Sequence, residues 1–261
     1  MSVISAAAAP AGFIPAATIA EVVERLDAVI DRARRENSRI GMFACLYRQV
    51  TVRVAEGIRA GRFQDGPRME RLDVIFANRY LAALEAYQAG RRPTRSWGVA
   101  FDAARGANLL ILQHLLLGIN AHINLDLGIA AAETAPGTQI IALKHDFDEI
   151  TNLLGEMLQD VQDRLSRVSP WMGVVDWIGM RHDEQVFSFA LGGSRDLAWN
   201  WARRFAGTDA ARLPHEIEAL DAVVAVMARA IHKPHFWLRP VLAAVRLREP
   251  KDVGRVLDAL T

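Results

Sequence analysis

One apolar stretch of the chain carries most of the side chains that could do chemistry. Residues 106–132, GANLLILQHLLLGINAHINLDLGIAAA, are strongly hydrophobic, yet they carry His114, Asn120, His122, Asn124 and Asp126. Polar groups in a protein core cost free energy unless each finds a partner. The stretch therefore predicts a buried polar seam, and these five residues are the candidate lining of a ligand pocket.

His122 and Asp126 have the spacing of a metal-binding pair. On a regular α-helix they lie one turn apart on the same face. An imidazole nitrogen and a carboxylate placed in this way can share a divalent metal ion such as Zn, Fe or Mn. Gly118, one turn earlier, would leave room for a ligand or for another helix. His114 lies ~12 Å from His122 along an ideal axis, so it joins the pair only if the helix kinks near Gly118.

A metal site needs at least one more protein ligand than this pair. The candidates for a third ligand are His145 and Asp148, at the start of the helix expected to follow the seam. Acidic side chains are favoured there by the helix dipole in any case, so a structural role is the simpler explanation of their position. In the structural alternative, His122 pairs with Asp126, and the asparagines bind neighbouring helices and fix their register.

The elements that must position this seam are helical. Apolar residues recur at helical spacing along most of the chain, and no segment alternates with a period of two between hairpin turns. The pattern predicts a central helix at about 106–132 and further helices at about 19–37, 39–60, 68–89, 96–105, 138–168, 183–205, 214–231 and 236–248. Short loops between such helices predict an all-α fold, a single multi-helix bundle built around the central helix.

The two ends of the chain carry separate expectations. Residues 1–17, rich in alanine and interrupted by Pro10 and Pro15, predict a flexible N-terminal arm, and residues 18–261 predict a single all-α domain. Segment 235–256 combines Phe236 and Trp237 with five basic residues. We expect its apolar face to pack on the bundle; the alternative is contact with an anionic membrane surface. No run reaches ~18 uninterrupted apolar residues, so we expect no transmembrane segment.

Composition and charge narrow the function classes. The chain has 261 residues, of which 51% are hydrophobic and 23% charged, as in folded globular proteins. A formal net charge of +1 gives no broad positive field, so we expect no nucleic-acid binding. Cys45 is the only cysteine, which precludes an intrachain disulfide and suggests a reducing, cytoplasmic location. The sequence leaves open a small-molecule ligand, a protein partner and homo-oligomerisation.

The central segment also resembles a known family. HLLLGINAHINLDL (114–127) resembles the GINAHINxDL signature of an uncharacterised family of bacterial all-helical proteins, a domain of unknown function. Weaker landmarks are LYRQVT (46–51), FANRYL (76–81), RSWGVAF (95–101), Asp146-Phe147, Asn152, Asp183-Glu184 and the pair Arg195 and Trp199. The resemblance extends from about residue 19 to 260. It implies a helical domain with the central stretch as its hallmark, and it implies no particular activity.

Two functions follow from these observations, and the sequence does not decide between an enzyme and a binding protein. The first is a metal-dependent, hydrolase-like or metal- or ligand-binding protein whose site lies on the central helix. The second is a non-catalytic helical domain that binds an apolar ligand or a protein partner. HExxH, P-loop, GxSxG and GxGxxG motifs are absent from the sequence. Arg48, Arg79 and Arg195 lie in amphipathic segments from which they could reach Asp126 or an anionic ligand.

Overall fold

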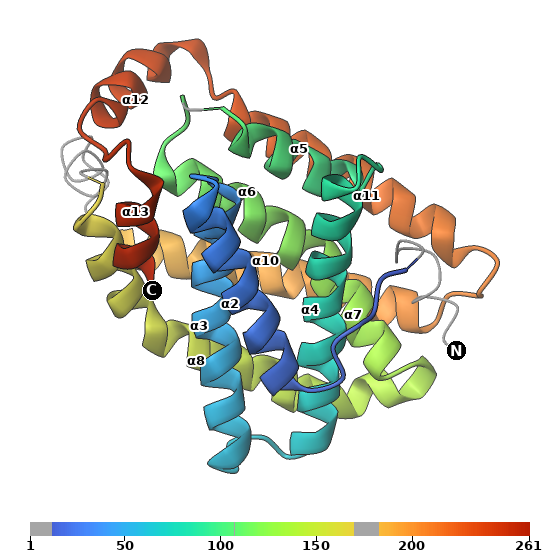
Figure 1. Ribbon diagram of the computed structural model, residues 1–261. Helices are drawn as coiled ribbons and strands as arrows, with labels where there is room; N and C mark the ends of the chain where they lie inside the picture. The colour runs from blue at the N-terminus through green and yellow to red at the C-terminus, as the bar shows by residue number, and fades with distance from the viewer. Residues whose placement is uncertain (1–11, 107, 170–182) are drawn as a thin grey trace.

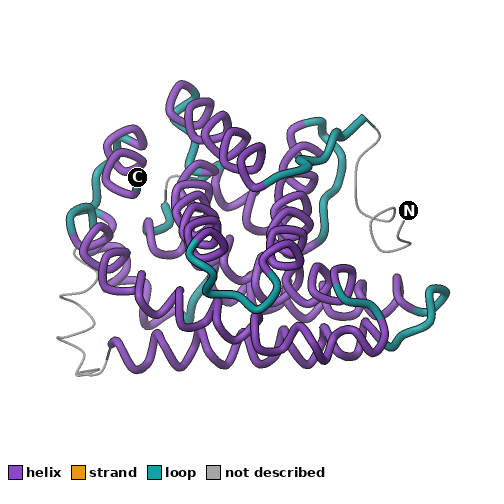
Figure 2. Tube along the Cα trace, turned by 90° about the horizontal axis from the view of Figure 1, so that it is seen from below, coloured by secondary structure: helices purple, strands orange, loops and turns teal. Residues whose placement is uncertain are grey.

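The computed structural model describes residues 12–106, 108–169 and 183–261, and within these ranges the regular structure consists of helices without strands (Figures 1 and 2). The all-α fold predicted from the apolar periodicity is therefore confirmed. For residues 158 and 183–192 the description extends to the backbone alone.

The helices follow one another with short connections. Their bounds are α2 (Ile19–Arg35), α3 (Ile40–Arg59), α4 (Gly66–Gln88), α5 (Arg95–Ala104), α6 (Ile111–Ala121), the π-helical turn η1 (His122–Asp126), α7 (Leu127–Thr134), the 3-10 turn η2 (Gly137–Gln139), α8 (Ile140–Ser166), α10 (Asp183–Ala206), α11 (Leu213–His232), the 3-10 turn η3 (Phe236–Leu238), α12 (Arg239–Arg246) and α13 (Val253–Leu260).

Local side-chain chemistry sets several of these bounds. The Thr18 hydroxyl accepts a hydrogen bond from the backbone N–H of Glu21 and caps α2, and Asp65 caps α4 in the same way. Gly61 and Gly90 follow α3 and α4 with φ of 69° and 71°. Because a left-handed conformation favours glycine, these positions end the two helices cleanly. The predicted start of a helix near residue 19 and the predicted end of another near residue 89 are both confirmed.

The central run Ile111–Thr134, made of α6, η1 and α7, is the element around which the other helices pack. Helices α3, α4, α5, α8, α10 and α11 all contact it, and it passes diagonally through the middle of Figure 1. The predicted central helix is thus confirmed, although it begins at Ile111 rather than near residue 106. The structure also replaces one α-helical turn by the wider turn η1, which the sequence did not indicate.

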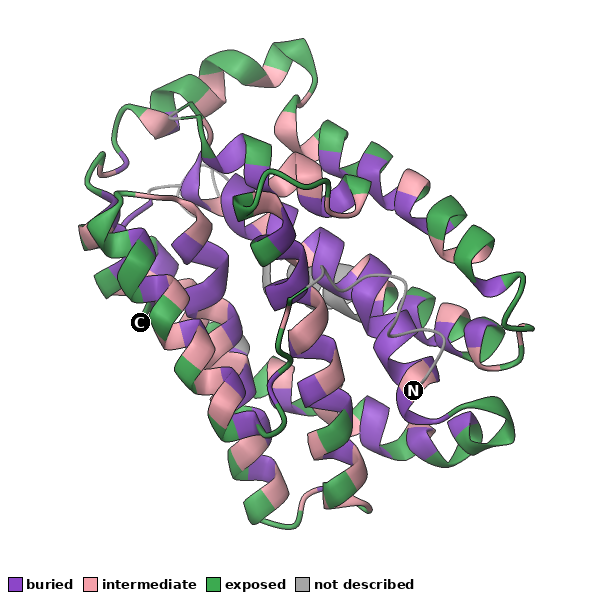
Figure 3. Cartoon of the chain, turned by 45° about the vertical axis from the view of Figure 1, so that its right-hand side comes forward, coloured by how far each residue is buried: buried purple, intermediate pink, exposed green. Residues whose placement is uncertain are grey.

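The same run is apolar enough, by length and composition, to cross a membrane. However, 83% of the most apolar 18-residue segment of this run is buried inside the protein. A core helix that packs on all sides passes the same compositional test, so the run is weak evidence for a membrane span. Figure 3 shows the buried residues gathered along the inner faces of the helices.

The remaining helices form the walls around this run. Helices α2, α3 and α4 lie side by side, while α5 pairs with α11 and α10 packs across α7 and η1 (Figure 1). Helix α8 packs along α3 and is met at its far end by α13. The central run is therefore enclosed by α3 and α4 on one side and by α8 and α10 on another, and this enclosure positions the site.

Residues 12–17 of the predicted N-terminal arm are held against α4. The backbone N–H of Ala16 donates to Asn78 Oδ1 at 2.8 Å, and Asn78 Nδ2 donates to the carbonyl oxygen of Ala16 at 2.9 Å. The side chain of Ala16 is buried. The first part of the arm, residues 1–11, lies outside the described residues.

The C-terminal segment differs from expectation. Phe236 is 71% exposed and Trp237 is 61% exposed, so the expectation that they pack on the bundle is wrong. The packing is achieved instead by α13, whose apolar face buries Val253, Val256 and Leu257 against α2, α3 and α8. Because α13 packs against α2, α3 and α8, the preceding elements η3 and α12 lie at the edge of the bundle, where the side chains of Phe236 and Trp237 are exposed to solvent.

Candidate functional site

The candidate site is built on the wide turn η1. The backbone N–H of Leu127 donates to the carbonyl oxygen of His122, five residues earlier, where an α-helix would use the residue four earlier. Both ends of this turn are deeply buried, since His122 is 3% exposed and Asp126 is 1% exposed. The two side chains that the sequence placed together are therefore neighbours inside the protein.

Asp126 is tied to two other helices. Arg79 Nε of α4 donates to Asp126 Oδ1 at 2.8 Å, and Trp97 Nε1 of α5 donates to Asp126 Oδ2 at 2.7 Å. Burial alone would raise the pKa of Asp126, but the charge of Arg79 and the surrounding donors outweigh it and hold this pKa below its usual range. Asp126 is thus a buried carboxylate whose charge is balanced by Arg79.

His122 lies among aromatic rings. Its imidazole stacks on Phe76 with 3.5 Å between ring centroids, and the ring of Tyr47 lies 4.2 Å away at a steep angle. Nδ1 lies 3.9 Å from Asp126 Oδ2, which is too long for a hydrogen bond. Neither ring nitrogen has a hydrogen-bond partner among the described residues. Burial lowers the pKa of His122, so the ring is neutral at pH 7 and keeps one unused donor and one unused acceptor.

A largely apolar cavity lies beside His122. It has a volume of about 120 Å³, is partly open to solvent, and lies between α3, α4, α8 and the central run. Its apolar walls come mainly from α3 and α8; the α8 residues are Ile150, Leu154, Met157 and Val161. This volume is several times the ~10–15 Å³ that one water molecule needs, so the cavity has room for more than a single water.

A few polar side chains interrupt these walls. Tyr47, Asp73 and His122 line the cavity, and the Tyr47 hydroxyl and Asp73 Oδ2 are also without a hydrogen-bond partner in the described chain. Burial, assisted by the nearby charge of Glu70, raises the pKa of Asp73 to about 7. Burial likewise raises the pKa of Tyr47 well above its usual value, so the phenol stays protonated. The cavity therefore offers hydrogen-bonding atoms within an apolar enclosure.

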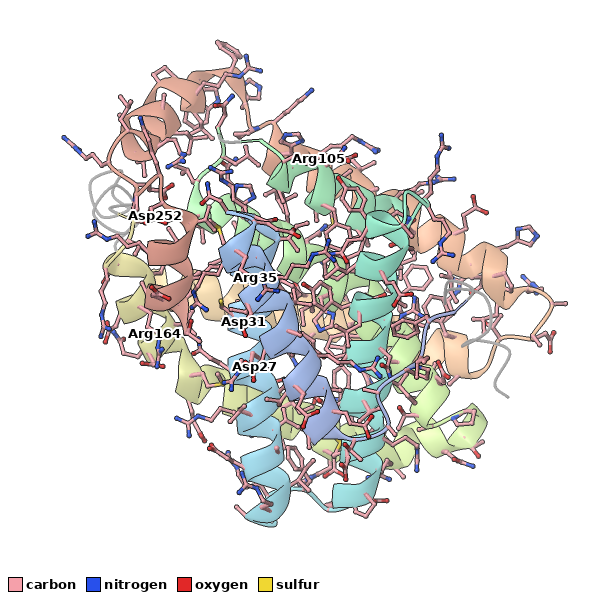
Figure 4. All side chains as sticks on the ribbon, viewed as in Figure 1. Asp27, Asp31, Arg35, Arg105, Arg164 and Asp252 are labelled. Carbon is pink, nitrogen blue, oxygen red and sulfur yellow. The ribbon has the colours of Figure 1, made fainter. Side chains whose placement is uncertain are left out.

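Arg195 of α10 also lines the cavity. It is 3% exposed; its Nε donates to Thr151 Oγ1 and its Nη2 donates to the carbonyl oxygen of Phe147, each at 2.6 Å. Burial lowers the pKa of Arg195 to about 10, so the guanidinium is still charged at neutral pH. Of the three arginines that the sequence singled out, Arg79 reaches Asp126, Arg195 reaches the cavity, and Arg48 pairs with Asp27 on the outer face of α2 (Figure 4).

His114 does not join His122. It is buried in a separate small space with Tyr80, and burial lowers its pKa to about 3. Gly118 accommodates another helix rather than a ligand, because a Cβ atom there would lie 2.5 Å from the ring of Phe43. The central run therefore positions its two histidines in two different spaces.

The asparagines of the seam have structural partners. Asn120 Nδ2 donates to the carbonyl oxygen of Val224 in α11 at 3.1 Å, and Asn124 Nδ2 donates to Asn120 Oδ1 at 3.0 Å. Asn120 is buried, whereas Asn124 is partly exposed. These bonds tie the central run to α11, which is the register-fixing role offered as the structural alternative.

The two candidates for a third metal ligand point elsewhere. His145 is exposed and lies beside Asp146, and Asp148 is exposed and accepts a hydrogen bond from Lys144. Among the described residues, no three His, Cys, Asp or Glu side chains are grouped in a way that could hold a metal ion. His122 and Asp126 are thus a pair without a third member in the described chain.

Sequence reasoning missed Asp73, and it assigned no site role to Tyr47, Phe76 and Trp97, although these three lie in the landmark segments 46–51, 76–81 and 95–101. One signal could have identified Asp73: it interrupts the apolar stripe of α4, with Leu72 before it and Phe76 one turn later. An acidic side chain on the buried face of a helix requires a partner or an altered pKa. Trp97 carried no comparable signal, because an indole at the start of a short helix is compatible with many packing arrangements.

Fold and site together define an all-α protein with a partly polar, internal apolar cavity beside its central helix. A family model described as a family of unknown function, DUF5995, matches residues 19–234, and the chain belongs to that family. This confirms the resemblance to an uncharacterised domain. No curated protein and no solved structure matches the chain significantly.

Proposed function

We propose that this protein binds a predominantly apolar small molecule in the cavity beside His122. The observation that carries the proposal is the cavity itself, which has mainly apolar walls interrupted by a small set of polar atoms. Large apolar enclosures with a few convergent polar groups are the usual form of small-molecule sites. Burial of the ligand's apolar surface would supply most of the affinity.

The unpartnered polar atoms support the same function. The Tyr47 hydroxyl and the nitrogens of His122 are buried without hydrogen-bond partners in the described chain. A buried polar group left in this way costs about 1–3 kcal/mol. A ligand with a donor or acceptor near these atoms would recover part of that cost, and the neutral imidazole could serve either as donor or as acceptor.

Metal-dependent hydrolysis has weaker support. It rests on the proximity of His122 and Asp126, but Arg79 and Trp97 already occupy both carboxylate oxygens of Asp126. A metal ion at Asp126 would compete with a buried ion pair for the carboxylate. Elemental analysis of purified protein tests this interpretation, together with thermal melts with and without a chelator. A stoichiometric transition metal and a chelator-dependent melting temperature would favour it over the apolar-ligand function.

Binding of an uncharged environment-sensitive fluorophore, N-phenylnaphthylamine, tests the proposed function. Leu154→Trp would fill part of the cavity from α8, whereas Ile141→Trp adds the same side chain at a position of α8 that is 72% exposed. We expect saturable fluorescence enhancement with the wild type and Ile141→Trp, and strongly reduced enhancement with Leu154→Trp. Equal binding to both variants, or no binding to the wild type, would refute the proposal. Circular dichroism checks that both variants remain folded.

A further inference from the structure

The most unusual charge in the cavity wall is that of Arg195. Only 3% of this residue is exposed, and no acidic side chain of the described chain lies within ion-pair distance of its guanidinium. The carboxylates of Asp148 and Asp196 act on it only from a distance. Buried charges are normally paired or strongly hydrogen-bonded. A buried guanidinium without an adjacent anion is therefore a candidate binding site for an anionic group of a ligand.

The hydrogen bonds of Arg195 leave part of its guanidinium free. Nε donates to Thr151 and Nη2 donates to the carbonyl oxygen of Phe147, while the ring of Phe147 lies 4.5 Å from the guanidinium carbon. A guanidinium has five N–H groups. The two bonds therefore leave both hydrogens of Nη1 and one of Nη2 without a partner in the described chain. These free N–H groups of Nη1 and Nη2 can donate hydrogen bonds to the two oxygens of a carboxylate.

The position of Arg195 gives the cavity a charged end and an apolar length. Its partners Phe147 and Thr151 flank Ile150, which begins the α8 stripe along the cavity wall. From Ile150 to Val161 this stripe extends over ~16 Å at 1.5 Å per residue. The stripe on α3, from Phe43 to Val54, covers the same number of residues. An extended hydrocarbon chain could lie between the two stripes with its headgroup at Arg195.

From this arrangement we infer that the ligand is a long-chain carboxylate whose headgroup is bound by Arg195 and whose chain occupies the apolar cavity. The inference rests on the proposed function, because it assigns a headgroup to the ligand of the same cavity. The apolar walls supply affinity for the chain, and Arg195 supplies the preference for an acid over an uncharged molecule of equal length. An ionised carboxylate is far better hydrated than an alcohol, so without Arg195 the cavity would favour the alcohol.

A pair of ligands tests the inference on the wild-type protein without any substitution. Dodecanoate and dodecanol have equal chain length, and each can be titrated at pH 8 against bound N-phenylnaphthylamine. A charge-assisted hydrogen bond to a buried cation corresponds to roughly 10- to 100-fold in affinity. We expect dodecanoate to displace the fluorophore at correspondingly lower concentration than dodecanol. Equal displacement by both, or tighter binding of the alcohol, would overturn the inference and leave the proposed function intact.

Two variants test whether Arg195 is the source of the preference for the carboxylate. Arg195→Met removes the charge from the cavity wall, and Arg48→Met removes the same charge from a residue that pairs with Asp27 outside the cavity. We expect Arg195→Met to lose the preference for dodecanoate while still binding dodecanol, and Arg48→Met to behave as the wild type. A preference that survives in folded Arg195→Met contradicts the assignment of the headgroup. If the fluorophore itself does not bind to the wild type, the proposed function fails first.

Discussion

Replacing Asp126 by Asn tests whether the seam is held together by a buried ion pair. If Asp126 paired only with His122, an Asn side chain could keep a hydrogen bond and the change would be mild. The structure gives Asp126 different partners: Arg79 Nε at 2.8 Å and Trp97 Nε1 at 2.7 Å, both donors. An Asn side chain has one acceptor atom and one donor atom. It can satisfy one of these two donors, and it removes the negative charge opposite Arg79.

The magnitude follows from burial. The side chains of Arg79 and Asp126 are 9% and 1% exposed, so solvent does little to screen the charge that Asp126→Asn leaves unpaired. Breaking a buried ion pair by removing one partner costs ~3–5 kcal/mol. Trp97→Phe removes only one hydrogen bond to the carboxylate and should cost ~1.5–3 kcal/mol. We therefore expect Asp126→Asn to be the more destabilising of the two.

Urea unfolding followed by far-UV circular dichroism measures both free energies. Asp148→Asn serves as the control, since Asp148 forms an exposed pair with Lys144 on α8 and should contribute below ~1 kcal/mol. Adding Arg79→Met to Asp126→Asn removes the stranded cation and should recover part of the lost stability. A near-neutral Asp126→Asn variant, or a double variant as unstable as the sum of the single changes, would refute the ion-pair reasoning.

The same carboxylate predicts a pH dependence. The folded-state pKa of Asp126 lies below its unfolded value of ~3.9. The unfolded chain therefore binds the proton first, and the stabilisation by Asp126 is complete above that unfolded value. It is lost as pH falls through the folded-state pKa. In Asp126→Asn this contribution is absent, so the stability difference between the two proteins should shrink at strongly acidic pH.

Three further perturbations test other parts of the structure. Gly118→Ala should destabilise the protein by ~1–3 kcal/mol, because the added Cβ would lie 2.5 Å from the ring of Phe43. The control Gly98→Ala on α5 has open space around it and should be neutral or stabilising by up to ~1 kcal/mol. Similar melting temperatures for the two variants would contradict the close contact. The folded-state pKa of His114 is about 3, below its unfolded value of ~6.5, so stability should fall as pH drops below 6.5, by up to ~1.4 kcal/mol per unit. His114→Phe should reduce the slope of stability against pH by the contribution of one proton, ~1.4 kcal/mol per pH unit. An unchanged slope would contradict burial of a neutral ring. The exposed aromatic residues Phe236 and Trp237 adjoin the basic helix α12. We therefore expect the protein to float with anionic vesicles, and we expect less protein to float at high salt or when both residues are replaced by alanine. Protein that stays in the soluble fraction would contradict membrane binding.

Much of the fold could be predicted because its determinants are local. The period of the apolar residues indicated the helices and their approximate bounds, and the hydrophobicity of 106–132 indicated the element at the centre. Burial of His122 and Asp126 followed from the same pattern. These properties depend on residues within a few turns of one another, and a sequence displays such relations directly.

The chemistry of the site could not be predicted in the same way. Asp126 is bound by Arg79 and Trp97, which are 47 and 29 residues away in the chain, and no local rule selects them from the other arginines and tryptophans. The wide turn at 122–126 has no side-chain signature either. The cavity is a property of how α3 and α8 approach each other, so its apolar stripes were visible in the sequence only as ordinary core positions.

Competition for Asp126 explains why the site presents an unpaired imidazole. Arg79 offers a guanidinium cation, whereas burial lowers the pKa of His122 and keeps its ring neutral. In a low-dielectric interior, a carboxylate gains more from a full positive charge than from a neutral N–H. Arg79 therefore binds the carboxylate, and His122 stacks on Phe76 with both ring nitrogens free of hydrogen-bond partners among the described residues. The same ion pair that stabilises the central turn thus leaves His122 available, in the cavity wall, to a ligand.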